Sequence, residues 1–144
     1  MTSRTRVSLL LLFLALAGCT RDCAPKVEDG WIRLVPGGMP MHAGFGRIDN
    51  TCPLPATILS ASSPTYGSIE LHQSTVVDGI NRMRQMQELR MTPNSAAILK
   101  SGGLHLMLMQ PSTPLKEGSR VAIAFKLADG RTVLGQFEVR KQAL

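Results

Sequence analysis

Short runs of alternating apolar and polar residues follow one another from Trp31 almost to the end of the chain. Alternation with a period of two predicts strands, and clusters of Gly, Pro, Asn and Asp between the runs predict turns. The predicted strands are 31–35, 43–48, 56–62, 68–73, 81–89, 96–99, 104–110, 120–127 and 132–140. Asp129-Gly130 predicts a two-residue hairpin. The pattern favours a single all-β domain, folded as a sandwich or barrel.

The first 18 residues have a different pattern, typical of a targeting segment. Arg4 and Arg6 precede an apolar run that is too short to span a bilayer as a helix. The run ends in Leu16-Ala17-Gly18-Cys19, which resembles the bacterial lipobox, whose Cys is acylated. We therefore expect a lipoprotein signal peptide at 1–18, lipidation of Cys19, a tether at 19–28, a domain at 29–140 and a short tail at 141–144. The alternative is an ordinary secretory signal with a chance Cys.

The charge of the chain is only mildly positive. Sixteen Lys and Arg against ten Asp and Glu give +6, and removing Arg4 and Arg6 leaves fourteen against ten, or +4. The basic residues are spread along the sequence, whereas a nucleic-acid-binding surface would cluster them. We therefore expect no nucleic-acid partner.

The chain has three cysteines, and the targeting segment implies an exported protein. Lipidation of Cys19 would leave Cys23 and Cys52, and an oxidising compartment permits a disulfide between them. The alternative is two free thiols, one of them available to bind metal.

The strand predicted at 104–110 carries candidate metal-binding residues. Its leucines at 104, 106 and 108 share one face, which must be core, so His105, Met107 and Met109 share the other. His72 lies in a second predicted strand, and Met83 lies between two arginines, an unusual place for a core Met. Imidazole and thioether donors together suit Cu(I), because thioether sulfur is soft and uncharged. Two His and two Met would form a neutral shell of four donors.

The spacing of these four residues is H-x10-M-x21-H-x-M, and the neighbouring residues extend the pattern. They include Trp31-Ile32-Arg33, Ala43-Gly44-Phe45, Asp78-Gly79 and Gly102-Gly103-Leu104. From about residue 29 to 139, the chain resembles the PCu(A)C-type periplasmic copper chaperones. The resemblance implies a cupredoxin-like Greek-key β-sandwich or barrel and a Cu(I) site of His72, Met83, His105 and Met107.

The resemblance also implies a function, and the lipobox-like segment implies a location. The expected protein is no enzyme but a monomeric Cu(I) carrier, anchored in the cell envelope and facing the periplasm, on the outer membrane in a Gram-negative host. The expected partner is a copper-accepting protein of respiratory oxidase assembly, chiefly for the binuclear copper centre. The His- and Met-rich C-terminal tail of some relatives is missing.

Three further soft or imidazole donors lie in the first predicted loop, at Met39, Met41 and His42. They form a possible auxiliary metal-capture site, and the alternative is a flexible polar loop.

Other functions fit the residues less well. A blue-copper electron carrier needs a Cys thiolate beside two His, and Cys52 lies far from the His/Met cluster in the sequence. Neither Gly-x-Ser-x-Gly nor His-Glu-x-x-His is present, which disfavours the common hydrolases. A copper-buffering lipoprotein would use the same site, and a purely structural lipoprotein would use none.

Overall fold

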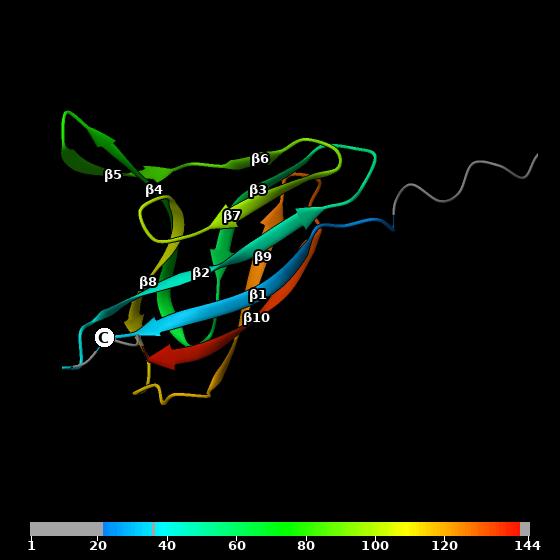
Figure 1. Ribbon diagram of the computed structural model, residues 1–144. Coiled ribbons are helices and arrows are strands. Elements are labelled where there is room, and N and C mark those ends of the chain that lie inside the picture. Colours follow the sequence, from blue (N-terminus) through cyan, green and yellow to red (C-terminus); the bar gives the residue numbers. More distant parts are fainter. Residues whose placement is uncertain (1–21, 36, 142–144) are drawn as a thin grey trace, which may run out of the picture.

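The computed structural model describes residues 22–35 and 37–141, which fold into a ten-stranded sheet without a helix in that part of the chain (Figure 1). The strands are β1 Lys26–Leu34, β2 Met41–Asn50, β3 Ala56–Ser62, β4 Tyr66–Val77, β5 Ile80–Met86, β6 Leu89–Met91, β7 Ser95–Leu99, β8 Leu104–Pro111, β9 Arg120–Leu127 and β10 Thr132–Lys141. The predicted all-β single domain is confirmed. No described residue belongs to a helix long and apolar enough to cross a bilayer.

Three of the expected features lie outside the described residues. These are the signal peptide at 1–18, the lipidation site Cys19 and all but the first residue of the tail at 141–144.

The sheet closes into a barrel. The strand order is β5-β4-β8-β7-β2-β1-β10-β9-β3-β6, and β3 also pairs with β4 through Ala61 and Ile69. This pairing closes a ring that leaves β5 and β6 outside it. Consequently the β4–β5 hairpin projects from one end of the barrel, as Figure 1 shows at the upper left. The hairpin is attached only along β4, since β5 pairs with no other strand among the described residues.

Several strands are longer than the sequence-based expectation, and two differences have a clear cause in strand pairing. β1 begins at Lys26, within the segment expected to be a tether, because Lys26 pairs with Asp49 at the end of β2. The single strand expected at 81–89 is divided into β5 and β6. The division follows from pairing, since β5 hydrogen-bonds to β4 and β6 to β3.

The barrel interior is filled by one apolar cluster. Its largest fully buried side chains include Phe125, Phe137, Ile32, Leu106 and Leu108. The last two come from β8, and their burial confirms that the leucine face of this strand is core. The His/Met face of β8 therefore lies on the outside of the barrel wall.

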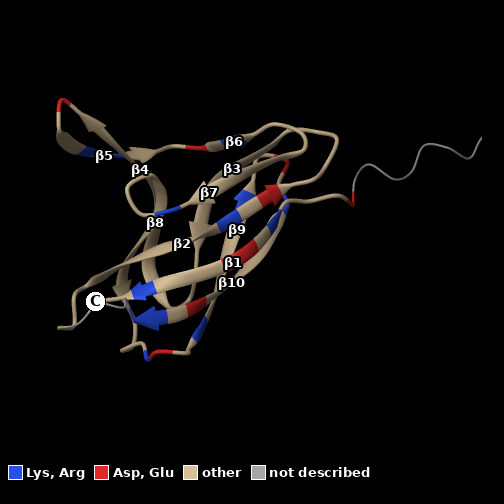
Figure 2. Ribbon diagram, viewed as in Figure 1, with Lys and Arg blue, Asp and Glu red and all other residues tan. Residues whose placement is uncertain are grey.

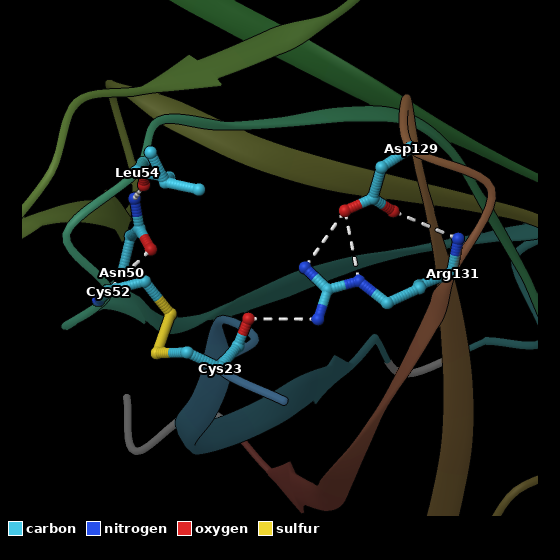
Figure 3. A network of polar contacts seen from close by, with 6 residues as sticks. All are labelled: Cys23, Asn50, Cys52, Leu54, Asp129 and Arg131. Atoms are coloured by element: carbon cyan, nitrogen blue, oxygen red, sulfur yellow. Dashed lines mark hydrogen bonds and ion pairs between the residues drawn. A yellow bond between two sulfur atoms is a disulfide. The ribbon is translucent and has the colours of Figure 1, made fainter. Parts of the chain in front are cut away.

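A disulfide joins Cys23 to Cys52, with the Cα atoms 5.7 Å apart, so the predicted pairing is confirmed (Figure 3). A guanidinium nitrogen of Arg131 donates a hydrogen bond of 2.9 Å to the carbonyl oxygen of Cys23, and Arg131 also forms an ion pair with Asp129. The hydrogen bond from the Arg131 guanidinium lowers the pKa of the Asp129 carboxyl group. The start of the domain is thus fixed to the end of β2 and to the β9–β10 hairpin.

Candidate metal centre

The two histidines face each other across neighbouring strands. His72 on β4 is paired with His105 on β8, and their ring centroids are 6.0 Å apart with an interplanar angle of 40°. Opposite residues of an antiparallel pair project from the same face of the sheet. Both imidazoles therefore project from the outer face, and the neighbouring Leu106 points into the core.

The two methionines of the predicted set belong to the same face. Met107 follows His105 by two residues on β8 and is paired with Glu70 on β4. Met83 comes from the projecting strand β5, where it is paired with Ser74, two residues beyond His72. The register of β5, β4 and β8 therefore brings all four predicted donors to one surface. A single slip in register would move Met83 to the opposite face.

Each histidine uses one ring nitrogen for a hydrogen bond within the protein. Nε2 of His72 lies 2.8 Å from the Oε2 of Glu70, and Nδ1 of His105 lies 2.9 Å from the carbonyl oxygen of Gly103. Carboxylate and carbonyl oxygens accept hydrogen bonds, which assigns the donor role to these two nitrogens. In the neutral rings, the lone pairs then lie on Nδ1 of His72 and Nε2 of His105.

The lone pair of His72 has an unusual environment. Its Nδ1 is buried and has no hydrogen-bond partner among the described residues. Buried polar atoms are nearly always paired, and an unpaired one costs free energy unless a ligand satisfies it. A metal ion bound at Nδ1 would satisfy it, while Glu70 would keep the ring in the required tautomer.

Exposure across the site is uneven. His105 is 7% exposed, whereas Met83 is 53% exposed. On β2 the ladder with β8 ends at Gly44, so Phe45 follows at the level of His105. Trp31 packs against Phe45 with ring centroids 4.7 Å apart, and the Arg33 guanidinium lies 4.7 Å from the Phe45 ring centroid. Phe45, Trp31 and Arg33 thus cover the site on the side of β2, whereas the side at the β4–β5 hairpin is open to solvent.

The donor set is neutral and soft. β8 carries no Lys, Arg, Asp or Glu, and β2 has none before Arg47, as Figure 2 shows by colour. The arginines of β5, Arg82 and Arg84, alternate with Met83 and so point to the other face. In the described part of the chain, no three His, Cys, Asp or Glu side chains converge as a metal site. Two imidazoles and two thioethers favour Cu(I) over zinc and over hard cations.

The structure does not bring together the proposed auxiliary donors Met39, Met41 and His42. His42 is 7% exposed, is paired with Leu108 on the core face, and shares a 3.0 Å hydrogen bond between its Nδ1 and the hydroxyl of Tyr66. Met41 precedes it on the strand and therefore points outward, and Met39 is exposed in the loop. The expected grouping does not form, because neighbouring strand residues point to opposite faces and His42 lies on the core side. Burial also lowers the pKa of His42.

Sequence analysis gave no role in the site to three contributors: Glu70, and Gly103 and Phe45, which it named only among the residues that carry the resemblance. The place of Glu70 could have been predicted from the sequence, since a strand residue two positions before His72 must share its face. The carbonyl of Gly103 also accepts a hydrogen bond of 3.0 Å from the backbone N–H of Ser74, which ties the β7–β8 turn to β4. That contact, like the place of Phe45 beside His105, depends on strand order, which the local sequence does not give.

Comparison with known proteins agrees with this architecture. A curated relative, "Putative lipoprotein Lxx21020" of Leifsonia xyli subsp. xyli, is 28% identical and covers 92% of this chain and 89% of its own length. The copper-bound PCuAC domain from PmoF2 superposes with a TM-score of 0.68 at 17% identity, covering 82% of this chain and 93% of that domain. The solution structure of CuI-DR1885 from Deinococcus radiodurans gives a TM-score of 0.66 at 28% identity, covering 81% and 78%.

These similarities confirm the cupredoxin-like β fold that the sequence resemblance implied. The family described as "Putative lipoprotein LpqE-like" matches residues 26–139, from the first residue of β1 nearly to the end of β10. The chain therefore belongs to the LpqE-like lipoprotein family and has the fold of the PCuAC domains.

Proposed function

We propose that this chain is a Cu(I) metallochaperone of the cell envelope, which carries one ion on His72, Met83, His105 and Met107. The observation that supports this most directly is the buried, unpartnered Nδ1 of His72, which lies on the same face as three further soft or borderline donors. The related CuI-DR1885, named for its copper, adds support at 28% identity. No bond in a substrate would be made or broken, because the ion is the cargo.

Uneven exposure suggests how the ion would be released. His105 and its backbone hydrogen bond are buried, so this ligand is held in place. Met83 is exposed and lies on a hairpin arm, so a ligand from an incoming protein can replace its thioether first. Release by ligand exchange requires such an open side, and a closed four-ligand cage would hinder it.

The expected destination is a copper-accepting protein of respiratory oxidase assembly, with the binuclear copper centre as the main recipient. We propose that Cys19 is lipidated and holds the monomeric domain at a membrane surface facing the periplasm. A lipid anchor with two or more chains would keep the domain attached. Transfer would then take place at that surface.

The first experiment is a Cu(I) competition titration against a chromophoric chelator, under anaerobic reducing conditions. Residues 22–144 suffice for it, because this segment contains every described strand, the core cluster and the disulfide. The parent should bind one ion tightly, and Met83→Leu and His105→Gln should both weaken binding. Met86→Leu is the matched control, since Met86 lies on the same strand but on the opposite face. Binding no tighter than that of an unrelated β-barrel would refute the proposal.

A second experiment separates transfer from storage. The loaded chain is mixed with a copper-depleted soluble domain that carries the binuclear centre of an oxidase, and the absorption spectrum of that centre is followed. Its appearance would support delivery. If copper remains on the chain, buffering of envelope copper becomes the better description of its function.

A further inference from the structure

A second pair of methionines lies next to the four proposed ligands. Met41 on β2 is directly opposite Met109 on β8, one step along the same ladder from the pair of Ala43 and Met107. Residues opposite one another have Cβ atoms about 5 Å apart, and successive positions on one face are about 7 Å apart. Met41, Met109 and Met107 therefore form a group of three thioethers on the outer face of the barrel.

The arrangement of this group leaves its sulfur atoms free to converge. The residue opposite Met107 is Ala43, whose small side chain leaves space between the three methionines. Met41 is 38% exposed, and Met109 is partly buried. The backbone N–H of Gln110 donates a 2.8 Å hydrogen bond to the carbonyl oxygen of Pro40, which fixes the start of β2 against β8. The pair is thus held on a rigid backbone while its flexible side chains remain adjustable.

These methionines are not explained as core. Buried Met91, at 4% exposed, fills the interior, whereas Met41 and Met109 project from the same face as His105. The three donors are all neutral thioethers, and the carboxylate opposite Met107, that of Glu70, is hydrogen-bonded to His72. A set of soft ligands suits a monovalent soft ion such as Cu(I) and disfavours zinc and hard cations.

We propose that Met41, Met109 and Met107 form a second, weaker Cu(I) site, which receives the ion first and passes it to the His72/His105 site through the shared Met107. The passing step rests on the proposed function of that site. Met41, which is 38% exposed, gives an incoming ion direct access to the methionine group, whereas the His72/His105 site is open at Met83 on the hairpin. The direction of transfer follows from ligand strength, since imidazole nitrogens added to thioethers bind the ion more tightly.

The test uses residues 22–144 with methyl-labelled methionine, and follows the signals of all the methionines by NMR during addition of Ag(I), a redox-inert substitute for Cu(I). The first equivalent should shift Met83 and Met107, and the second should shift Met41 and Met109 and shift the shared Met107 again. In the double variant Met41→Leu/Met109→Leu, which conserves side-chain volume, the number of bound ions should fall from two to one. Met86→Leu is again the matched control.

The possible outcomes distinguish the two proposals. If Met83 and Met107 shift while Met41 and Met109 stay fixed through several equivalents, the second site does not exist. If Met41 and Met109 shift while Met83 does not, the second site stands alone and the proposed function fails. The order of transfer is tested by the rate at which Cu(I) from a weak soluble complex reaches the His72/His105 site. That rate should fall in the double variant at unchanged final affinity, and an unchanged rate would overturn the loading role.

Discussion

His72 and His105 lie opposite each other on β4 and β8 with ring centroids 6.0 Å apart, and each ring is oriented by a different kind of acceptor. A carboxylate holds His72 through Nε2, and a backbone carbonyl holds His105 through Nδ1. The backbone contact cannot be removed by changing a side chain, but the carboxylate contact can. This asymmetry makes the orientation of His72 open to direct test.

Glu70→Gln should weaken Cu(I) binding by about 10- to 100-fold, the usual cost of losing a partner that orients a metal-binding histidine. Gln keeps the size of Glu70 but removes the charge that favours the Nε2–H tautomer of His72. Competition titration measures the affinity, and ¹⁵N shifts of the imidazole report the tautomer. Glu88→Gln is the control, because Glu88 lies outside the site and is paired with Arg90. An unchanged affinity with an unchanged tautomer would remove Glu70 from the site.

Met83→Leu should reduce Cu(I) affinity and leave the free energy of unfolding within about 0.5 kcal/mol of the parent, as expected for an exposed position. The substitution keeps the volume and removes the sulfur. Urea unfolding without metal and a chelator titration give the two values. Met86→Leu should leave the affinity unchanged, since its side chain lies on the opposite face of β5. Equal affinities for the two variants would contradict the four-ligand arrangement.

Much of this architecture could be predicted from local pattern. Alternation in β8 alone established which face is core and placed His105 and Met107 together. Local pattern could not show that β5 and β6 are separate strands, because the division is made by their different partners, β4 and β3. The early start of β1 at Lys26 likewise depends on pairing with Asp49.

The candidate site was predictable only as far as it depends on local sequence pattern. Spacing identified the four candidate ligands, but the pairing of Met41 with Met109 joins residues far apart in the sequence and needed the strand order. The grouping of Met39, Met41 and His42 relied on closeness in sequence, and strand alternation separates it. His42 is instead a core histidine bonded to Tyr66.

Removing the disulfide with Cys23→Ser/Cys52→Ser should lower the free energy of unfolding by about 3–4 kcal/mol, from loop-closure entropy over the separation of 29 residues. Copper affinity should not change, because the start of β1 and the end of β2 lie at the other end of the barrel from the β4–β5 hairpin (Figure 1). Urea unfolding and competition titration measure the two quantities. A loss of affinity at a pH and temperature where the variant is folded would show that the two ends are coupled.

Acid should destabilise the metal-free domain through His42. Burial lowers its pKa in the folded state, so the unfolded chain binds a proton more readily than the folded one. The contribution of His42 is therefore complete above about pH 6.5, the pKa of an unperturbed histidine, and is lost as the pH falls from there through the lowered folded-state value. Urea unfolding between pH 8 and 5, with chelator present, should show this slope. His42→Gln should flatten it, and an equally steep slope in that variant would assign the acid sensitivity to other groups.

Oxidation of individual methionines should report metal occupancy residue by residue. Sulfoxide formation follows exposure, so hydrogen peroxide should modify Met83 and Met39, which are 53% and 47% exposed, well before Met91, which is 4% exposed. Ag(I) replaces Cu(I) in this experiment, because Cu(I) itself reacts with peroxide. One equivalent should protect Met83, since its sulfur lone pair is engaged by the ion, and a second should protect Met41. Met39 is the internal control, because it is similarly exposed but belongs to neither proposed site, and peptide mass spectrometry measures all of them in one sample. Equal protection of Met39 and Met83 would mean that the ion binds exposed thioethers without discrimination, and would count against a built site.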